Sequence, residues 1–315
     1  MSREDLINVT RAILARAGFD ISPALNLRSV CFDVVGRRDR TLLLIKILSN
    51  IDAFSRENGS EMKVLAEALG ASPLLIGERS SAGALEPGIV YSRFGIPIIS
   101  NETLADHLLE EVPPFMFAAP GGLYVKLDRD LLRLAREKRG VSLGTLAETA
   151  GVSRRTIQMY EAGMGAMIDA ALRLEEFLGV PIIAAVDPFE YKQSDPDRRY
   201  EITGNGRTGS NVLDRLLDIG FAVTPIQRGP FDALTRGGDT VMITGLGNEE
   251  DKVVQKATIA SDISRISGRY SVIIVDNHRG LENIRSTAVV TKEEIKKMDD
   301  RSELTDLVLE RSGKA

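Results

Sequence analysis

The chain has 315 residues, of which 43% are hydrophobic and 27% are charged. This length is enough for two or three domains with hydrophobic cores. No segment approaches the roughly 20 consecutive apolar residues that cross a membrane, and the N-terminus lacks the apolar run of a signal peptide. We therefore expect a soluble, cytoplasmic protein without a membrane partner.

Cysteine and histidine are scarce in this sequence. Cys31 is the only cysteine, which excludes an internal disulfide and a thiolate metal cluster. His107 and His278 lie far apart and are expected to be surface or cap residues rather than ligands. The sequence therefore predicts no metal and no other cofactor.

Residues 1–120 are predicted to form an α/β domain, because segments of apolar periodicity 3.6 and 2 alternate along it. A polar turn is expected at 36–40, and Ser100 is placed to cap a helix. A hairpin at 115–126 has Pro120-Gly121-Gly122 in its middle. The expected helices are 3–17, 53–69 and 101–110, and the expected strands are 19–21, 29–35, 41–48, 73–77 and 96–99.

Residues 121–189 contain two short amphipathic helices separated by a glycine turn. Ser142 can cap the first helix and Ser153 the second. Gly151 supplies the backbone freedom for a sharp turn between them, and Ile157 points toward the core. This spacing predicts a helix-turn-helix domain.

The second of these helices, 153–161, carries polar side chains on its outer face. At about 100° per residue, Arg154, Arg155 and Gln158 share the face opposite Ile157. Arg can bind guanine in the major groove through two hydrogen bonds, and Gln can bind adenine in the same way. Double-stranded DNA is therefore the expected partner.

The charge distribution is compatible with DNA binding although the net charge is −5. Residues 126–160 contain eight Lys or Arg and four Asp or Glu, which gives +8 − 4 = +4 and leaves −9 for the rest of the chain. The phosphate contribution to affinity depends on charges near the groove. We expect an acidic body that carries a basic reading surface.

The segment resembles the Cro/C1 type of helix-turn-helix. The resemblance implies that DNA contacts come from Ser142, Leu143, Ser153, Arg154, Arg155, Thr156 and Gln158. It also implies that Glu161 is structural and pairs with Arg133 or Arg136. The matching motifs are Leu132-Arg133-Leu134-Ala135-Arg136-Glu137, Gly140-Val141-Ser142, Leu146-Ala147-Glu148, Gly151-Val152-Ser153, Thr156-Ile157, Tyr160-Glu161-Ala162-Gly163 and Phe177-Leu178-Gly179-Val180.

Two positions depart from the Cro/C1 pattern. Leu143 stands where this family often has a glutamine that contacts the DNA backbone, which weakens one expected contact. The proline usually found shortly after Gly163 is missing. The pattern therefore does not define where the next helix starts.

Beyond the helix-turn-helix, residues 190–210 are polar and rich in Gly and Asp, as is typical of a linker. Residues 211–315 then repeat the layout of the N-terminal domain. Leu216 to Phe221 echoes Leu14 to Phe19, and Phe231-Asp232 echoes Phe32-Asp33. We therefore expect a second α/β domain of the same kind.

Two short motifs stand out within this second α/β domain. Thr291 and Glu294 form a capping-box pattern at the start of a helix. Gly245-Leu246-Gly247-Asn248 has a superficial likeness to a phosphate-binding loop, but it is expected to close a hairpin.

The order of elements in both α/β domains resembles the restriction-endonuclease-like fold. Nucleases of that fold place an Asp on one strand and an acidic-x-Lys motif on the next, because two carboxylates hold Mg²⁺ beside the scissile phosphate. Asp33 and Lys46 match in the first copy, but Leu44 replaces the second carboxylate. The second copy keeps Asp232, with Ile243 and Gly245 at the other two positions.

The predicted fold class is therefore α/β plus all-α. It consists of two non-catalytic restriction-endonuclease-like domains, 1–120 and 211–315, that flank a Cro/C1-type helix-turn-helix bundle.

As a whole, the chain resembles an archaeal family of HTH-type transcriptional regulatory proteins. That resemblance implies a sequence-specific regulator and not an enzyme. One recognition helix reads only a few base pairs, so we expect a homodimer. The α/β domains are expected to supply the dimer contact and a place for an unidentified small-molecule effector. The motifs outside the helix-turn-helix that carry the resemblance are Phe32-Asp33-Val34-Val35, the segment 44–52 and Ala119-Pro120-Gly121-Gly122.

Three alternative hypotheses remain at this point. The first is a DNA-processing nuclease that the helix-turn-helix delivers to DNA. The second is a helix-turn-helix kept only for packing or dimerisation. The third is a protein-interaction scaffold, which predicts no salt-dependent affinity for DNA.

Overall fold

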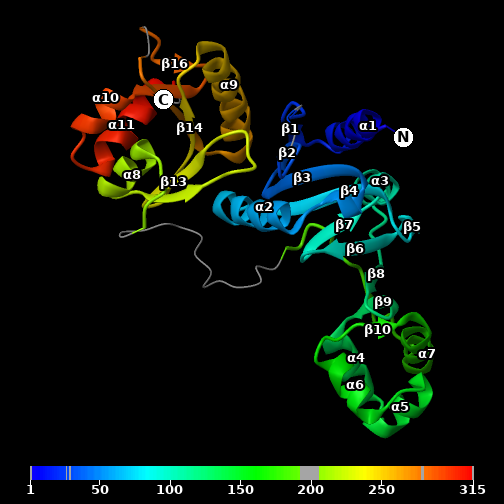
Figure 1. Cartoon of the computed structure of the whole chain (residues 1–315). Helices are drawn as coiled ribbons and strands as arrows, with labels where there is room; N and C mark the ends of the chain where they lie inside the picture. The colour runs from blue at the N-terminus through cyan, green and yellow to red at the C-terminus, as the bar shows by residue number, and fades with distance from the viewer. Residues whose placement is uncertain (1, 26, 28–29, 192–205, 278–279, 314–315) are drawn as a thin grey trace. The chain divides into compact units, whose positions relative to one another are not determined.

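The computed structural model describes residues 2–25, 27, 30–191, 206–277 and 280–313 (Figure 1). The linker expected at 190–210 falls mostly on residues outside this description. The chain divides into two compact units, and each unit combines three stretches of sequence. The first unit consists of Met1–Ile13, Leu48–Ala53 and Leu74–Tyr191. The second unit consists of Leu14–Ile47, Phe54–Pro73 and Lys192–Ala315. Among the described residues, no helix combines the length and the apolar composition that crossing a bilayer requires.

The first α/β domain has the strand order β1-β2-β3-β4-β7-β6. Strands β1, β2 and β3 pair antiparallel, whereas β4 and β7 pair parallel. Ser100 caps α3 as predicted, because its hydroxyl accepts a hydrogen bond from the Thr103 N–H. The elements are α1 (Arg3–Arg16), β1 (Asp20–Ile21), β2 (Val34–Arg38), β3 (Thr41–Asn50), a 3-10 turn (Ile51–Ala53), α2 (Arg56–Leu69), β4 (Ser72–Ser80), β5 (Gly83–Ala84), β6 (Ile89–Arg93), β7 (Ile96–Ile99) and α3 (Asn101–Leu109).

Strand β2 corrects the expectation of a strand at 29–35 and a turn at 36–40. The strand starts only at Val34 and runs to Arg38, which pairs with Thr41. The turn is shorter than predicted because Asp39 adopts a positive φ of 52°, so two residues suffice to reverse the chain. In the described residues just before β2, the Cys31 N–H donates to the carbonyl of Arg228, and the Asp33 N–H donates to the carbonyl of Ile45 on β3.

The helix-turn-helix domain (HTH domain) packs four helices against a hairpin. Strand β9 pairs antiparallel with β8, β10 and β11, so three short strands hold the domain's helices to its base. Leu132, Leu146, Ile157 and Leu174 are fully buried at its centre. The elements are β8 (Met116–Ala119), β9 (Gly122–Leu127), α4 (Arg129–Lys138), α5 (Leu143–Ala150), α6 (Arg154–Glu161), β10 (Ala166–Met167), α7 (Ile168–Leu178) and β11 (Ile183–Ala184).

The second α/β domain has the strand order β12-β13-β14-β15-β17-β16, which matches the path β1-β2-β3-β4-β7-β6 of the first sheet; that sheet also carries β5 beside β4 and continues from β6 into β8, β9 and β10. Again three strands pair antiparallel and the next pairs are parallel. The predicted capping box at Thr291 and Glu294 is present. The elements are α8 (Asn211–Asp218), β12 (Ala222–Pro225), β13 (Ala233–Gly237), β14 (Thr240–Gly247), α9 (Glu250–Ser267), β15 (Tyr270–Val275), β16 (Asn283–Ile284), β17 (Thr287–Thr291), α10 (Lys292–Lys297) and α11 (Arg301–Arg311).

The motif Gly245-Leu246-Gly247-Asn248 does not close a hairpin, contrary to expectation. Its first three residues are the end of β14, which pairs in parallel with β15. A parallel pair requires a crossover, and α9 provides it.

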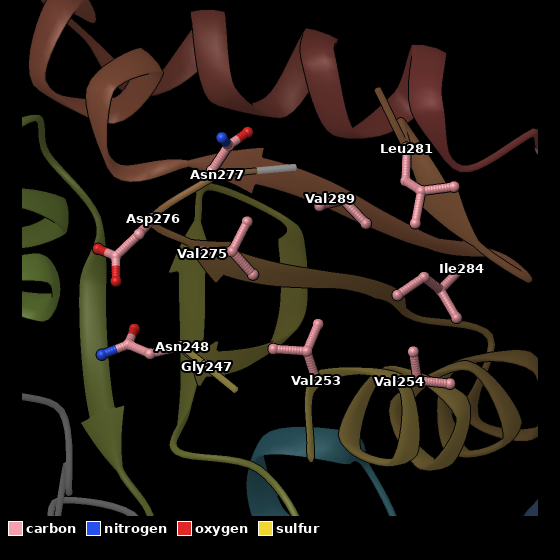
Figure 2. Close-up of a pocket in the computed structure, with 10 residues that line it drawn as sticks. All are labelled: Gly247, Asn248, Val253, Val254, Val275, Asp276, Asn277, Leu281, Ile284 and Val289. Carbon is pink, nitrogen blue, oxygen red and sulfur yellow. The ribbon is translucent and has the colours of Figure 1, made fainter. Parts of the chain in front are cut away.

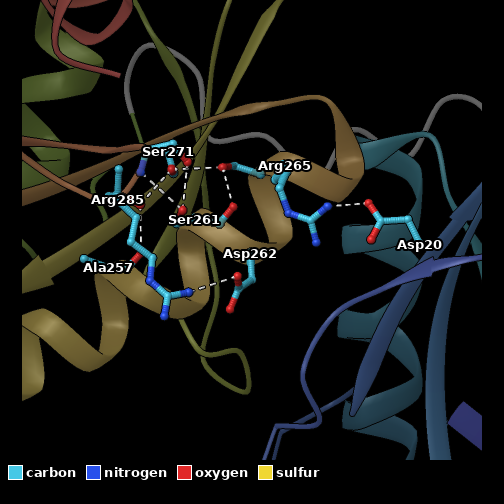
Figure 3. A network of polar contacts seen from close by, with 10 residues as sticks. Asp20, Ala257, Ser261, Asp262, Arg265, Ser271 and Arg285 are labelled. Carbon is cyan, nitrogen blue, oxygen red and sulfur yellow. Dashed lines mark hydrogen bonds and ion pairs between the residues drawn. The ribbon is translucent and has the colours of Figure 1, made fainter. Parts of the chain in front are cut away.

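Helix α9 is held to the second sheet by buried hydroxyl groups (Figure 3). Ser271 Oγ lies 3.2 Å from Ser264 Oγ and 2.9 Å from Thr287 Oγ1. Thr287 Oγ1 in turn donates to the carbonyl of Ala257 at 2.7 Å. Buried hydroxyls are costly unless they are paired, so this network fixes the helix on the strands.

Candidate nucleic-acid interface

Serine side chains begin both helices of the helix-turn-helix, as the sequence predicts. Ser142 Oγ accepts the N–H of Thr145 at 3.1 Å, and Ser153 Oγ accepts the N–H of Thr156 at 3.0 Å. Gly151 ends α5 in the left-handed conformation, with φ 70°. Strong caps and a left-handed glycine together set a tight turn between α5 and α6.

One face of helix α6 is buried in the HTH domain, and the opposite face is exposed to solvent. Ile157 is fully buried, and Tyr160 is 3% exposed. Arg154, Arg155 and Gln158 are all exposed. The structure thus brings the three predicted base-reading side chains to the surface of a single helix.

The other predicted contact positions are partly engaged in the fold. Thr156 is half-buried, and its hydroxyl lies 2.8 Å from that of Ser153. Leu143 is half-buried and packs against the core of the HTH domain. An apolar side chain there therefore stabilises α5, whereas the glutamine common in the family would contact DNA.

The side chain of Arg154 lies over Gly144, in the first turn of α5. A Cβ atom on Gly144 would come within 2.8 Å of the guanidinium nitrogens Nε and Nη2 of Arg154. Gly144 therefore leaves room for this charge beside the N-terminus of α5. This packing was not apparent from the sequence, although a glycine inside a short helix is the feature that could have indicated it.

Glu161 forms the predicted structural ion pair with α4. Its Oε1 lies 2.6 Å from Arg136 Nε, and its Oε2 lies 3.3 Å from Arg136 Nη2. Arg133 Nε is farther away, at 3.7 Å. Because the Glu161 side chain is 8% exposed and that of Arg136 16%, this pair fixes the end of α6 against α4.

The start of α7 is set by strand pairing. Met167, its N-cap residue, makes no side-chain cap hydrogen bond. Instead Ala166 and Met167 form β10 and pair with Val125 and Tyr124 of β9. This pairing replaces the proline of the Cro/C1 pattern in fixing where the helix begins.

His107 does not join the candidate interface. His107 lies in the last turn of α3, is half-buried, and has its ring 5.2 Å from the ring of Phe189. This position is less exposed than the sequence indicated. His278 lies outside the described residues.

The nuclease-like positions of the first α/β domain form a buried ion pair. Lys46 Nζ lies 3.1 Å from Asp33 Oδ1 and donates to the carbonyl of Val30 at 2.7 Å. The other oxygen of Asp33 accepts the N–H of Ile47 at 2.8 Å. The Asp33 side chain has no exposed surface. With both oxygens engaged and Leu44 in place of a second carboxylate, these residues do not fit a Mg²⁺ site.

The second α/β domain rebuilds this ion pair with a lysine from another element. Asp232 Oδ2 accepts the N–H of Leu246 at 2.6 Å, which matches the bond from Ile47 to Asp33. The cation is Lys256 of α9, whose Nζ lies 2.8 Å from Asp232 Oδ2. A Cβ on Gly245 would lie 3.1 Å from Lys256 Cδ. The glycine at the position equivalent to Lys46 thus makes room for the helix lysine, which the sequence pattern did not predict.

Taken together, these features define a DNA-binding helix-turn-helix domain joined to α/β domains of nuclease-like topology. Family models match the helix-turn-helix domain and the first of the two α/β domains. The model described as "Helix-turn-helix" matches residues 132–183, and the model described as "PD-(D/E)XK superfamily domain" matches residues 3–114.

Relatives cover the full length of the chain. A protein of Methanocella arvoryzae is 42% identical over 100% of this chain and 98% of its own length. Proteins of Methanosarcina barkeri and Halobacterium salinarum are each 38% identical over 99% of this chain and 98% of their own length. All three are named as HTH-type transcriptional regulatory proteins. No solved structure gives a significant match.

The chain belongs to this archaeal family of HTH-type transcriptional regulatory proteins.

Proposed function

We propose that the protein is a sequence-specific transcriptional regulator that reads the major groove of double-stranded DNA with α6. The observation that carries this proposal is the exposed set of Arg154, Arg155 and Gln158 on a helix anchored by Ile157 and Glu161. Guanidinium and amide groups at this spacing can form bidentate hydrogen bonds to guanine and adenine. Ser142, Leu143, Ser153 and Thr156, at the starts of α5 and α6, would lie beside the phosphates.

Selection of bound sequences from genomic fragments, followed by affinity measurements at several salt concentrations, tests this proposal. Arg155→Ala and Gln158→Ala should each lower affinity for the selected site by about 1–3 kcal/mol and relax specificity. Arg16→Ala, which removes an exposed arginine of α1, is the matched control and should bind normally. Unchanged binding by both α6 variants would show that the helix-turn-helix serves only packing.

We further propose that the regulator acts as a homodimer. A single α6 covers only a few base pairs, and a two-fold pair gains both affinity and site length. We assign the dimer contact to the α/β domains, which lie outside the DNA-reading helix. Light scattering on the purified chain, free and with its DNA, measures the oligomeric state.

We infer that neither α/β domain cleaves DNA. Each retains one carboxylate of the nuclease pattern, Asp33 or Asp232, and each of these carboxylates is bonded to a lysine and a backbone N–H. Linear, nicked and branched DNA should stay intact with Mg²⁺ present. Cleavage that disappears in Lys46→Ala would instead support the nuclease alternative.

A further inference from the structure

A cavity of about 170 Å³ opens in the second α/β domain, where β14 and β15 end (Figure 2). These two strands pair in parallel, so their carboxyl ends lie at one edge of the sheet. In open α/β sheets this edge is where ligands bind. The cavity is smaller than the 300–1,000 Å³ typical of drug-sized ligands, which favours a small molecule.

One end of the cavity is aliphatic. Val253 and Val254 come from the first turns of α9, Val289 from β17 and Ile284 from β16. Figure 2 shows these side chains directed toward one another, together with Leu281. Val254 is 44% exposed and Leu281 52%, so aliphatic surface remains open to solvent at the mouth.

Gly247 allows α9 to approach the strand end this closely. A Cβ on Gly247 would lie 2.4 Å from Val253 Cγ2, which is too close for any side chain. The second glycine of the Gly245-Leu246-Gly247-Asn248 motif therefore shapes the cavity wall.

The other end of the cavity is polar and carries the carboxylate of Asp276, and the ammonium group of Lys292 adjoins this end through contacts to two of its lining residues. Asn248, Asp276 and Asn277 line it. Lys292 Nζ, at the start of α10, lies 2.8 Å from Asp276 Oδ1 and 3.2 Å from Asn248 Oδ1. The Asp276 side chain is 61% exposed. Such a solvent-accessible ion pair contributes little stability and can open for a ligand.

We propose that this cavity binds a free α-amino acid with an aliphatic side chain. A ligand with only a cationic head would lie against Lys292, and one with only an anionic head would lie against Asp276. A zwitterion satisfies both, because its carboxylate faces Lys292 while its ammonium group faces Asp276. The aliphatic side chain then covers Val253, Val254 and Ile284. The site lies outside the DNA-reading helix and would make the regulator responsive to amino acid supply.

Isothermal titration of the full-length protein tests the head-group assignment with three probes that share one aliphatic part. L-leucine is expected to bind. Isocaproate, which keeps only the carboxylate, and isoamylamine, which keeps only the ammonium group, should each bind at least about ten-fold more weakly. Equal binding of either single-charge probe, or no binding of leucine, valine or isoleucine, would overturn the proposal.

Variants test the location of the site. Asp276→Asn and Lys292→Met should each weaken L-leucine binding by about ten-fold or more, and so should Val254→Asp at the exposed mouth. Lys297→Met, an exposed lysine of the same helix α10, should bind L-leucine normally. Circular dichroism confirms that each variant is folded. Normal binding by Asp276→Asn and Lys292→Met together would place the ligand elsewhere.

Titration of the protein alone does not depend on DNA. Failure of α6 to recognise DNA would therefore leave this result intact, and failure of leucine to bind would leave the DNA-reading proposal intact.

Discussion

Glu161 shows how a single buried charge determines the position of α6. Its carboxylate is 8% exposed and bonded to Arg136 at 2.6 Å. Removing one partner of a buried pair leaves the other charge uncompensated. Glu161→Gln should therefore lower the free energy of unfolding by about 3 kcal/mol.

Denaturant unfolding measures this loss, and Arg133→Gln is the control. Arg133 is 56% exposed and lies 3.7 Å from Glu161, so its replacement should cost less than about 1 kcal/mol. An equal loss in the two variants would contradict the assignment of Arg136 as the main partner.

Replacement of Gly144 should change the stability of the protein and its affinity for DNA in opposite directions. Alanine has a higher helix propensity than glycine, so Gly144→Ala should raise the stability of α5 by up to about 1 kcal/mol. Its methyl group would displace the guanidinium of Arg154, which lies 2.8 Å from the position that the new Cβ atom would occupy. We expect weaker DNA binding by a better-folded protein. Thermal unfolding and gel-shift titration, measured on the same sample, distinguish the two effects.

At the scale of elements, α7 lacks a side-chain cap and should be improved by one. Met167 has the extended backbone of an N-cap residue, with φ −64° and ψ 145°, and its side chain is 52% exposed. Met167→Ser should add a bond to an N–H of the first turn and stabilise the protein by about 1 kcal/mol. Met159→Ser, an exposed methionine within α6, should give no such increase in unfolding temperature.

The capping box of α10 makes the second α/β domain sensitive to acid. Burial raises the pKa of Glu294, but hydrogen bonds from Arg311 and from the N–H and hydroxyl of Thr291 outweigh it and lower the pKa from 4.5 to about 2. Because the pKa of Glu294 is lower in the folded state, its carboxylate stabilises the folded protein fully above pH 4.5. This contribution is lost as the pH falls toward 2.

Glu294→Gln should therefore lower the unfolding temperature clearly at pH 6, and the difference from the unaltered protein should shrink as the pH falls below 4.5. Glu293→Gln is the control, because the Glu293 side chain is 73% exposed. A difference that stays constant with pH would exclude the carboxylate as its source.

Periodicity and caps predicted most helices, but they could not predict pairings that depend on distant residues. Strand β7 at 96–99 and the caps Ser100, Ser142 and Ser153 follow from local sequence. The segment just before β2 is bonded through Cys31 to Arg228, a residue far away in the sequence, and no local pattern contains that bond. Strand β6 at Ile89–Arg93 and helix α11 at Arg301–Arg311 were missed because neither has a strong periodic signal.

The candidate interface was predicted in outline and not in detail. Spacing alone places Arg154, Arg155 and Gln158 on one face, since that depends only on helix geometry. The packing of Arg154 over Gly144 and the use of Leu143 in the core depend on how α5 and α6 meet. Those contacts are tertiary, and no local pattern in the sequence contains them.

At the scale of the whole molecule, the two α/β domains share one strand order, and hydrogen bonds join β2 and α2 to the end of α9 and to the residue that follows its C-cap. Arg37 donates to the carbonyl of Ser267 at 3.1 Å, and Arg269 donates to that of Leu69 at 3.4 Å. Each chain therefore carries a paired set of like domains but a single reading helix.

A homodimer of such chains should protect two half-sites on DNA. Their centres should lie about 34 Å apart, or 10–10.5 base pairs, or a multiple of that distance. Hydroxyl-radical footprinting on a selected site measures the spacing. Protection of one isolated half-site at saturating protein would contradict the homodimer.

The lysine that pairs with the aspartate of the nuclease pattern lies on β3 in the first α/β domain and on α9 in the second. This difference affects how such domains can be recognised. Lys46 and Lys256 place the same ammonium group beside equivalent aspartates, yet they approach from different elements. The nuclease-like family model matches residues 3–114, and a search for a lysine at a fixed interval after the aspartate would not recognise the second copy, which has Gly245 at that position. Copies of this domain that have lost the nuclease sequence pattern should therefore be sought in other proteins by comparing three-dimensional structures. The features to compare are the strand order and the position of the aspartate–lysine ion pair.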